Sequence, residues 1–116
     1  MSRSAPPNLA QARRQFARLR QELARLGPIS QGSVQDRTGR SGGGAGYQWT
    51  RKLAGKTVTV ALTAEQFVQL RQAVGNYRQL RHHLRRMESL SRRMIFQSNP
   101  HTARRKRLSQ QVLGIN

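Results

Sequence analysis

The amino-acid sequence predicts an α+β protein in which an antiparallel two-helix, coiled-coil-like hairpin carries a small β-hairpin between the helices. Apolar residues recur at steps of three and four in residues 8–27 and 63–97, as in helices that pair along a seam. Polar and apolar residues alternate between these segments, as in strands. The length of 116 residues allows one small domain. We expect a leader over residues 1–7, this domain over residues 8–97 and a basic tail over residues 98–116.

The first expected helix covers residues 8–27 and has a narrow apolar stripe. Pro7 suits the first turn of a helix, and Gly27 with Pro28 marks its end. Helices of this length gain most of their stability from packing, so the stripe predicts a partner helix. The stripe consists of Leu9, Ala12, Phe16, Leu19, Leu23 and Leu26.

The expected β-hairpin covers residues 47–62. A two-residue turn at Ala54 and Gly55 brings all the apolar side chains to one face, whereas a three-residue turn scatters them over both. The turn sets two apolar pairs, Trp49 with Val60 and Tyr47 with Leu62. Because an isolated hairpin is barely stable, we expect this face to pack on the helices. The segment Ser33–Arg37 is a candidate for a short third strand.

The second expected helix covers residues 63–97. Thr63 and Gln66 have the spacing of a capping box, in which each residue bonds the backbone of the other. Gly75 is a weak point in the helix, and Pro100 marks its end. The apolar seam consists of Phe67, Leu70, Val74, Tyr77, Leu80, Leu84, Met87, Leu90 and Met94.

The charge balance indicates an acidic partner. The chain has 22 basic and 4 acidic residues, a formal net charge of +18, and 19 of the basic residues are arginine. Nucleic acid is the commonest partner of so basic a chain. An anionic membrane surface and an acidic protein are the alternatives.

Arginines on both expected helices are the main candidates for nucleic-acid contact. Arg71, Arg78, Arg85 and Arg92 recur every seven residues and form one row beside the apolar seam. A row of guanidinium groups on a helix can follow a phosphate backbone with little sequence preference. The alternative is an ordinary solvated helix surface. The expected contact residues on the helices are Arg13, Arg14, Arg18, Arg71, Arg78, Arg81, Arg85, Arg92 and Arg93.

Two further segments have both a functional and a structural interpretation. The tail has a basic cluster of Arg104, Arg105, Lys106 and Arg107. This cluster indicates either a basic arm that binds nucleic acid or an ordinary charged tail. Tyr47 and Trp49 could stack on bases, but the strand pairing favours a place in the core.

The sequence gives little sign of catalysis. The four carboxylates Glu22, Asp36, Glu65 and Glu88 are scattered, and there is no cysteine. The adjacent His82 and His83 point about 100° apart on a helix and make no metal face. The glycine-rich residues 39–46 lack the Lys-Ser/Thr of a phosphate-binding loop and precede a strand. We expect no enzyme activity, no metal and no cofactor.

Three short motifs resemble a family of small basic bacterial proteins. The motifs are Gly32-Ser33-Val34 followed by Arg37, Gly55-Lys56-Thr57, and Asn76-Tyr77-Arg78. That family has a domain of unknown function and is often found near mobile elements, so the resemblance implies a mobile-element nucleoprotein. Its members commonly carry a cysteine-containing knuckle where this chain has residues 39–46, and no role of that knuckle transfers to this sequence.

These observations leave three functional hypotheses. The first is a DNA-binding accessory subunit of a mobile-element complex. The second is an RNA-binding subunit that stabilises a structured RNA, which the excess of arginine over lysine favours weakly. The third is an adaptor whose helical seam pairs with a larger enzyme. In each case we expect a cytoplasmic protein, associated with the nucleoid or a ribonucleoprotein, with no membrane partner and with helical seams that allow a homo-oligomer.

Overall fold

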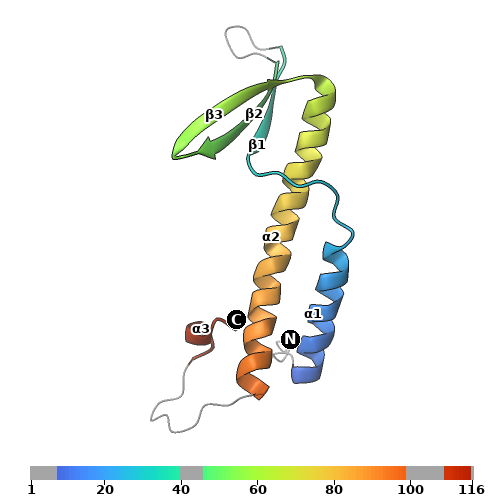
Figure 1. Ribbon diagram of the computed structural model, residues 1–116, viewed down its shortest axis with the longest axis vertical. Coiled ribbons are helices and arrows are strands. Elements are labelled where there is room, and N and C mark those ends of the chain that lie inside the picture. The colour runs from blue at the N-terminus through green and yellow to red at the C-terminus, as the bar shows by residue number, and fades with distance from the viewer. Residues whose placement is uncertain (1–7, 40–45, 99–108, 116) are drawn as a thin grey trace, which may run out of the picture. The chain divides into compact units, whose positions relative to one another are not determined.

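The protein mixes helices with a three-stranded antiparallel sheet (Figure 1). A computed structural model describes residues 8–39, 46–98 and 109–115. The elements are α1 (Leu9–Leu23), β1 (Ser33–Arg37), β2 (Gly46–Leu53), β3 (Lys56–Leu62), α2 (Ala64–Ser98) and α3 (Gln110–Leu113). They separate into two compact units, which we call the helical unit (Met1–Arg25 and Arg81–Asn116) and the sheet unit (Leu26–Leu80). The long helix α2 contributes to both units.

The sheet has the strand order β1-β2-β3. Trp49 pairs with Val60 and Tyr47 pairs with Leu62, which confirms the predicted register and the two-residue turn. At this turn Ala54 and Gly55 both have positive φ angles, of 52° and 80°. The candidate third strand is also confirmed, because β1 pairs with β2 along its whole length.

Aromatic side chains join the sheet to the first half of α2. The ring centroids of Tyr47 and Phe67 are 4.6 Å apart, and Phe67 is buried. Ala73 and Val74 are buried about two turns further along the helix. Because Tyr47 lies on β2 and Phe67 on α2, the expected packing of the hairpin on a helix is present within the sheet unit.

The segment before β1 is fixed by polar contacts within the sheet unit. The indole Nε1 of Trp49 donates to the Gln31 carbonyl oxygen at 3.0 Å. The next residue, Gly32, has φ of +107°, and a Cβ there would lie 2.5 Å from both the Thr50 oxygen and the Trp49 Nε1. Only glycine therefore allows this close approach.

Helix α2 begins at the predicted capping box. The Thr63 N–H donates to Gln66 Oε1 at 2.9 Å, and the Gln66 N–H donates to Thr63 Oγ1 at 3.1 Å. The helix continues through Gly75. Beside it, the Asn76 side-chain amide donates to the Pro28 carbonyl oxygen at 2.9 Å.

The helical unit places α1 beside the C-terminal part of α2 (Figure 1). Its two fully buried apolar side chains among the described residues are Ala12 and Leu90, both 0% exposed. Helix α1 ends at Leu23, four residues before the predicted end. The Arg25 N–H donates to the Glu22 carbonyl oxygen at 3.1 Å, a tight turn that closes the helix.

The predicted tail contains a short helix, α3, that the sequence analysis missed. Ser109 caps its start, and Gly114 ends it in the left-handed conformation. Ile115 is buried. Over the described ranges, no helix is long and apolar enough to cross a membrane.

Candidate nucleic-acid interface

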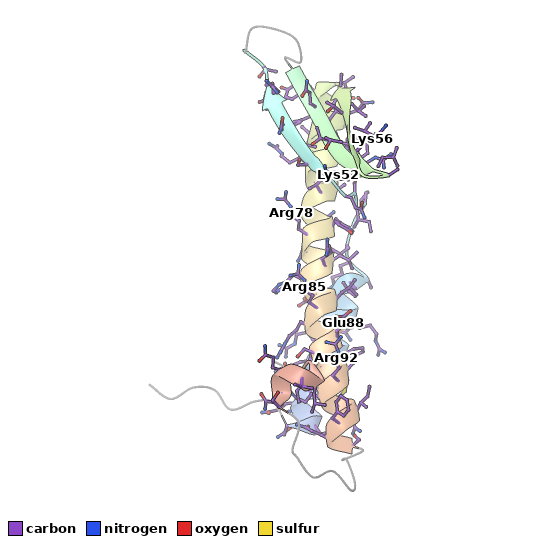
Figure 2. All side chains as sticks on the ribbon, turned by 90° about the vertical axis from the view of Figure 1, so that its left-hand side faces the viewer. Lys52, Lys56, Arg78, Arg85, Glu88 and Arg92 are labelled. Carbon is purple, nitrogen blue, oxygen red and sulfur yellow. The ribbon has the colours of Figure 1, made fainter. Side chains whose placement is uncertain are left out.

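In the sheet unit, α2 presents Arg71 and Arg78 as exposed side chains, and Figure 2 shows Arg78. They are seven residues apart and so lie on one face of the helix. The Arg71 guanidinium lies 5.1 Å from the centroid of the Phe67 ring, which holds its stem against the helix surface. Both members of the predicted row in this unit are therefore available to an anion.

Asp36 lies within the electrostatic influence of Arg71. The Thr38 hydroxyl and the Thr38 N–H both donate to Asp36 Oδ1, at 2.6 Å and 3.0 Å. These hydrogen bonds hold the pKa of the Asp36 carboxyl below its ordinary value of 3.8, and the Arg71 charge acts in the same direction. The carboxylate therefore offsets part of the positive field near Arg71.

In the helical unit, α2 presents Arg81, Arg85 and Arg92 as exposed side chains. Figure 2 shows Arg85, Glu88 and Arg92 along this part of the helix. Arg92 Nη2 lies 3.7 Å from Glu88 Oε2, and its Nη1 donates to the Gly114 carbonyl oxygen at 3.2 Å. Arg92 therefore has an ion pair and a backbone hydrogen bond inside the protein that compete with a phosphate contact.

Arg93 requires a correction, because the predicted phosphate contact is a buried side chain. It is 5% exposed, and its Nη2 donates to the Ile115 carbonyl oxygen at 2.7 Å. The guanidinium holds the end of the α3 segment against α2. We therefore leave Arg93 out of the proposed interface.

On α1, the predicted contact residues Arg13, Arg14 and Arg18 are all exposed, as are Arg20 and Arg25. They share the helical unit with Arg86, whose Nη2 donates to Gln15 Oε1 at 2.8 Å. Arg86 thus joins the two helices. The predicted tail cluster of Arg104, Arg105, Lys106 and Arg107 lies outside the described residues.

The proposed base-stacking aromatics make contacts within the protein. The Tyr47 ring packs on Phe67, and the Trp49 indole is hydrogen-bonded to Gln31. The Arg51 guanidinium lies 5.4 Å from the centroid of the Trp49 ring. These contacts favour the structural role that the strand register predicted.

Two features of the sheet unit were not predicted from the sequence. Lys52 and Lys56 are exposed beside the β2–β3 turn (Figure 2), and two lysines flanking a tight turn were visible in the sequence. An open apolar groove of about 730 Å³ lies between the sheet and α2. Its sequence signal is the uncharged, β-branched run that follows Lys56.

Titratable groups in the helical unit serve as contacts between helices. His83 Nε2 lies 2.6 Å from Glu22 Oε2, which connects α2 with α1. Within the described parts of the chain, no three His, Asp or Glu side chains gather in a way that could hold a metal ion.

Comparison of the chain with protein-family models, curated proteins and solved structures gave no match. The resemblance of the three short motifs to a bacterial family therefore stays a hypothesis. In the structure these motifs lie at the start of β1, at the β2–β3 turn and on α2.

Proposed function

We propose that this protein is a non-catalytic nucleic-acid-binding protein that contacts the phosphate backbone through Arg-rich helices. The principal contacts are Arg71, Arg78, Arg81, Arg85 and Arg92 on α2, with Arg13, Arg14 and Arg18 on α1. Its cellular setting in this proposal is a DNA nucleoprotein complex of the transposition type, in which the chain is an accessory subunit.

One observation supports the proposal above all: the eight proposed arginines are exposed in a chain whose formal net charge is +18. Solvated protein surfaces ordinarily carry both signs of charge. Here four carboxylates face 22 basic residues, so most of the positive charge has no acidic counterpart. Phosphate groups would supply the missing negative charge, and their condensed counterions would be released on binding.

The helical unit supports an antiparallel, coiled-coil-like arrangement of α1 with residues 81–98, which is part of this proposal. Gln15 contacts Arg86, and Glu22, further along α1, contacts His83, which is earlier in α2. A contact nearer the C-terminus of α1 is thus made by a residue nearer the N-terminus of α2, which is the pattern of antiparallel helices. Two basic helices side by side repel each other, and bound phosphate would relieve that repulsion.

An RNA-binding subunit of a ribonucleoprotein is the second candidate. The observation that favours it is the excess of arginine, 19 of 22 basic residues, because the planar guanidinium stacks on bases as well as pairing with phosphate. An adaptor whose helical seam pairs with a larger enzyme is the third candidate.

The test measures binding to duplex DNA, a structured RNA and a single strand across a series of salt concentrations. We compare R71Q/R78Q/R85Q with R20Q/R25Q/K56Q, which removes the same three charges from exposed positions outside the proposed contacts. For duplex DNA, each lost phosphate contact lowers the slope of log affinity against log salt by about 0.9. The first variant should therefore lose about 3 in slope, and the control should change little.

The nucleic acid with the greatest affinity at physiological salt distinguishes the DNA from the RNA candidate. Equal slopes in the wild-type protein and R71Q/R78Q/R85Q would overturn the proposed contacts. Equal losses in the two variants would show that binding follows net charge and has no defined site.

A further inference from the structure

The sheet unit has an open apolar groove between the sheet and the first half of α2. Its volume is about 730 Å³. Trp49 on β2 and two residues of β3 line one side, and α2 lines the other. The full lining is Pro28, Ile29, Ser30, Trp49, Val60, Leu62, Gln66, Gln69, Leu70, Gln72 and Ala73.

The lining contains no charged residue, although the chain has 22 basic ones. A phosphate ligand would need cations, so this groove suits a different class of ligand from the arginine-rich surfaces. Ile29 and Val60 are 48% and 41% exposed, which leaves apolar surface open at the groove. Gln66, Gln69 and Gln72 supply amide groups that can bond a backbone.

The groove borders an edge strand, because Val60 and Leu62 belong to β3 and the strand order places β3 at one side of the sheet. Proteins usually protect such an edge with charges, proline, a bulge or a short strand. The opposite edge, β1, is five residues long and ends in Asp36 and Arg37. After Lys56, β3 has neither charge nor proline, and its register with β2 runs without a bulge.

We propose that the edge of β3 and the adjacent groove bind an extended segment of a partner protein in which apolar and acidic side chains alternate. Backbone hydrogen bonds to β3 would add a fourth strand to the sheet. Because side chains alternate along a strand, every second one would enter the groove beside Val60 and Leu62. The others would lie on the opposite face of the sheet, the face that carries Lys52.

Charge complementarity selects an acidic partner over a second copy of this chain. The sheet unit has seven basic residues and two acidic ones, and the whole chain carries +18. Two such chains would repel as they approached each other. An acidic strand would be attracted, while its apolar side chains would account for the uncharged lining.

The probe is a synthetic peptide of about eight residues in which valine and glutamate alternate, a length that matches an ordinary strand. Val60→Glu places a charge in the groove and should lower the affinity for this peptide at least about tenfold. Val68→Glu is the matched control, because Val68 is 53% exposed on α2 outside the groove. It makes the same charge change and should leave the affinity within about twofold.

Three altered peptides test the binding mode without changing the protein. A peptide of the same composition with its valines grouped at one end should bind weakly, because they cannot all face the groove. Peptides N-methylated at every second residue, in both phases, should show one phase that fails to bind, since strand addition needs the amides of one edge. Equal binding by all these peptides would overturn the proposal.

Hydrogen exchange and sedimentation distinguish the proposed strand from other occupants of the groove. Strand addition should slow exchange of amides in β3. Protection confined to α2 would indicate a helix in the groove and would overturn the proposal. Self-association that Val60→Glu abolishes would identify a second copy as the occupant, and would likewise overturn it.

This inference stands apart from the proposed nucleic-acid function. Val60→Glu should leave the salt slope for duplex DNA unchanged, and R71Q/R78Q/R85Q should retain peptide binding within about threefold after allowance for the lost charge. The two proposals can therefore fail independently.

Discussion

The helical unit and the sheet unit differ in their charge and in the kinds of residue that they bury. The helical unit holds fifteen of the basic residues and two of the acidic ones, whereas the sheet unit holds seven and two. The buried residues of the sheet unit, Phe67, Ala73 and Val74, are all apolar, and Phe67 packs on Tyr47 of the sheet. In the helical unit, a buried arginine lies among the core residues Ala12, Leu90 and Ile115.

This difference shows two ways to order a highly basic chain. In the sheet unit the described buried residues are apolar, and Arg51 and Arg71 pack over the Trp49 and Phe67 rings without being buried themselves. The helical unit uses the cations themselves, since Arg86 and Arg93 bond the neighbouring segments α1 and α3. Substitutions should therefore act through packing in the first unit and through polar contacts in the second.

The largest effect is expected for Gly32→Ala in the sheet unit. The new methyl group would meet the Thr50 oxygen and the Trp49 indole at 2.5 Å, at a φ of +107° that alanine tolerates poorly. Steric overlap and backbone strain together should lower the free energy of unfolding by about 3 kcal/mol. Trp49, the single tryptophan, reports this unfolding by fluorescence.

Gly75→Ala is the matched control for that substitution. A Cβ on Gly75 would meet nothing within 4 Å, and alanine is the better helix former. This variant should be more stable than the wild-type protein by about 1 kcal/mol. Destabilisation by both substitutions would contradict the contrast between the two glycines.

A smaller effect is expected for Arg93→Gln in the helical unit. The shorter side chain leaves the buried Ile115 carbonyl oxygen without its charged donor, which should cost about 2 kcal/mol. Helicity at 222 nm during urea unfolding measures this loss. The salt slope for duplex DNA should not change, whereas Arg85→Gln, at an exposed position, should lower the slope by about 0.9.

The smallest effect is expected for the stability of the protein at acid pH. The folded-state pKa of Asp36 lies below its unfolded value of 3.8, because Thr38 and Arg71 favour the carboxylate. Its stabilising contribution is therefore present above pH 3.8 and is lost as the pH falls through the folded-state pKa. Unfolding is followed by Trp49 fluorescence at about pH 6 and at about pH 3. Asp36→Asn should reduce the difference between the two unfolding midpoints. An unchanged difference would contradict this assignment.

Much of the sheet unit could be predicted from the sequence, because its signals are local. The alternation in residues 47–62 fixes which side chains share a face, and the two-residue turn then fixes the register. The capping box at Thr63 was equally clear in the sequence, and its two hydrogen bonds are present. The uncharged run after Lys56 was visible in the sequence, but the groove itself could not be predicted, because its width depends on the spacing between the sheet and α2.

The arginines show a different limit of sequence analysis. Seven-residue spacing correctly separated exposed positions such as Arg78 and Arg85 from the apolar seam. It could not show that Arg93 is buried, because its partner Ile115 is 22 residues away and follows no periodic signal. The early end of α1 was missed for a similar reason, since a tight turn at Glu22 and Arg25 has no distinctive residue type.

The β2–β3 turn has a consequence for which contacts keep the hairpin closed. Ala54 sits in a left-handed conformation that costs an L-residue roughly 1–2 kcal/mol, so the tip of this hairpin opposes its own closure. The compensating contacts lie at the other end, where Tyr47 faces Leu62 and packs on Phe67. The closed hairpin therefore depends on the contacts near the helix, and replacing Ala54 with glycine would relieve the conformational cost at the turn while leaving those contacts unchanged.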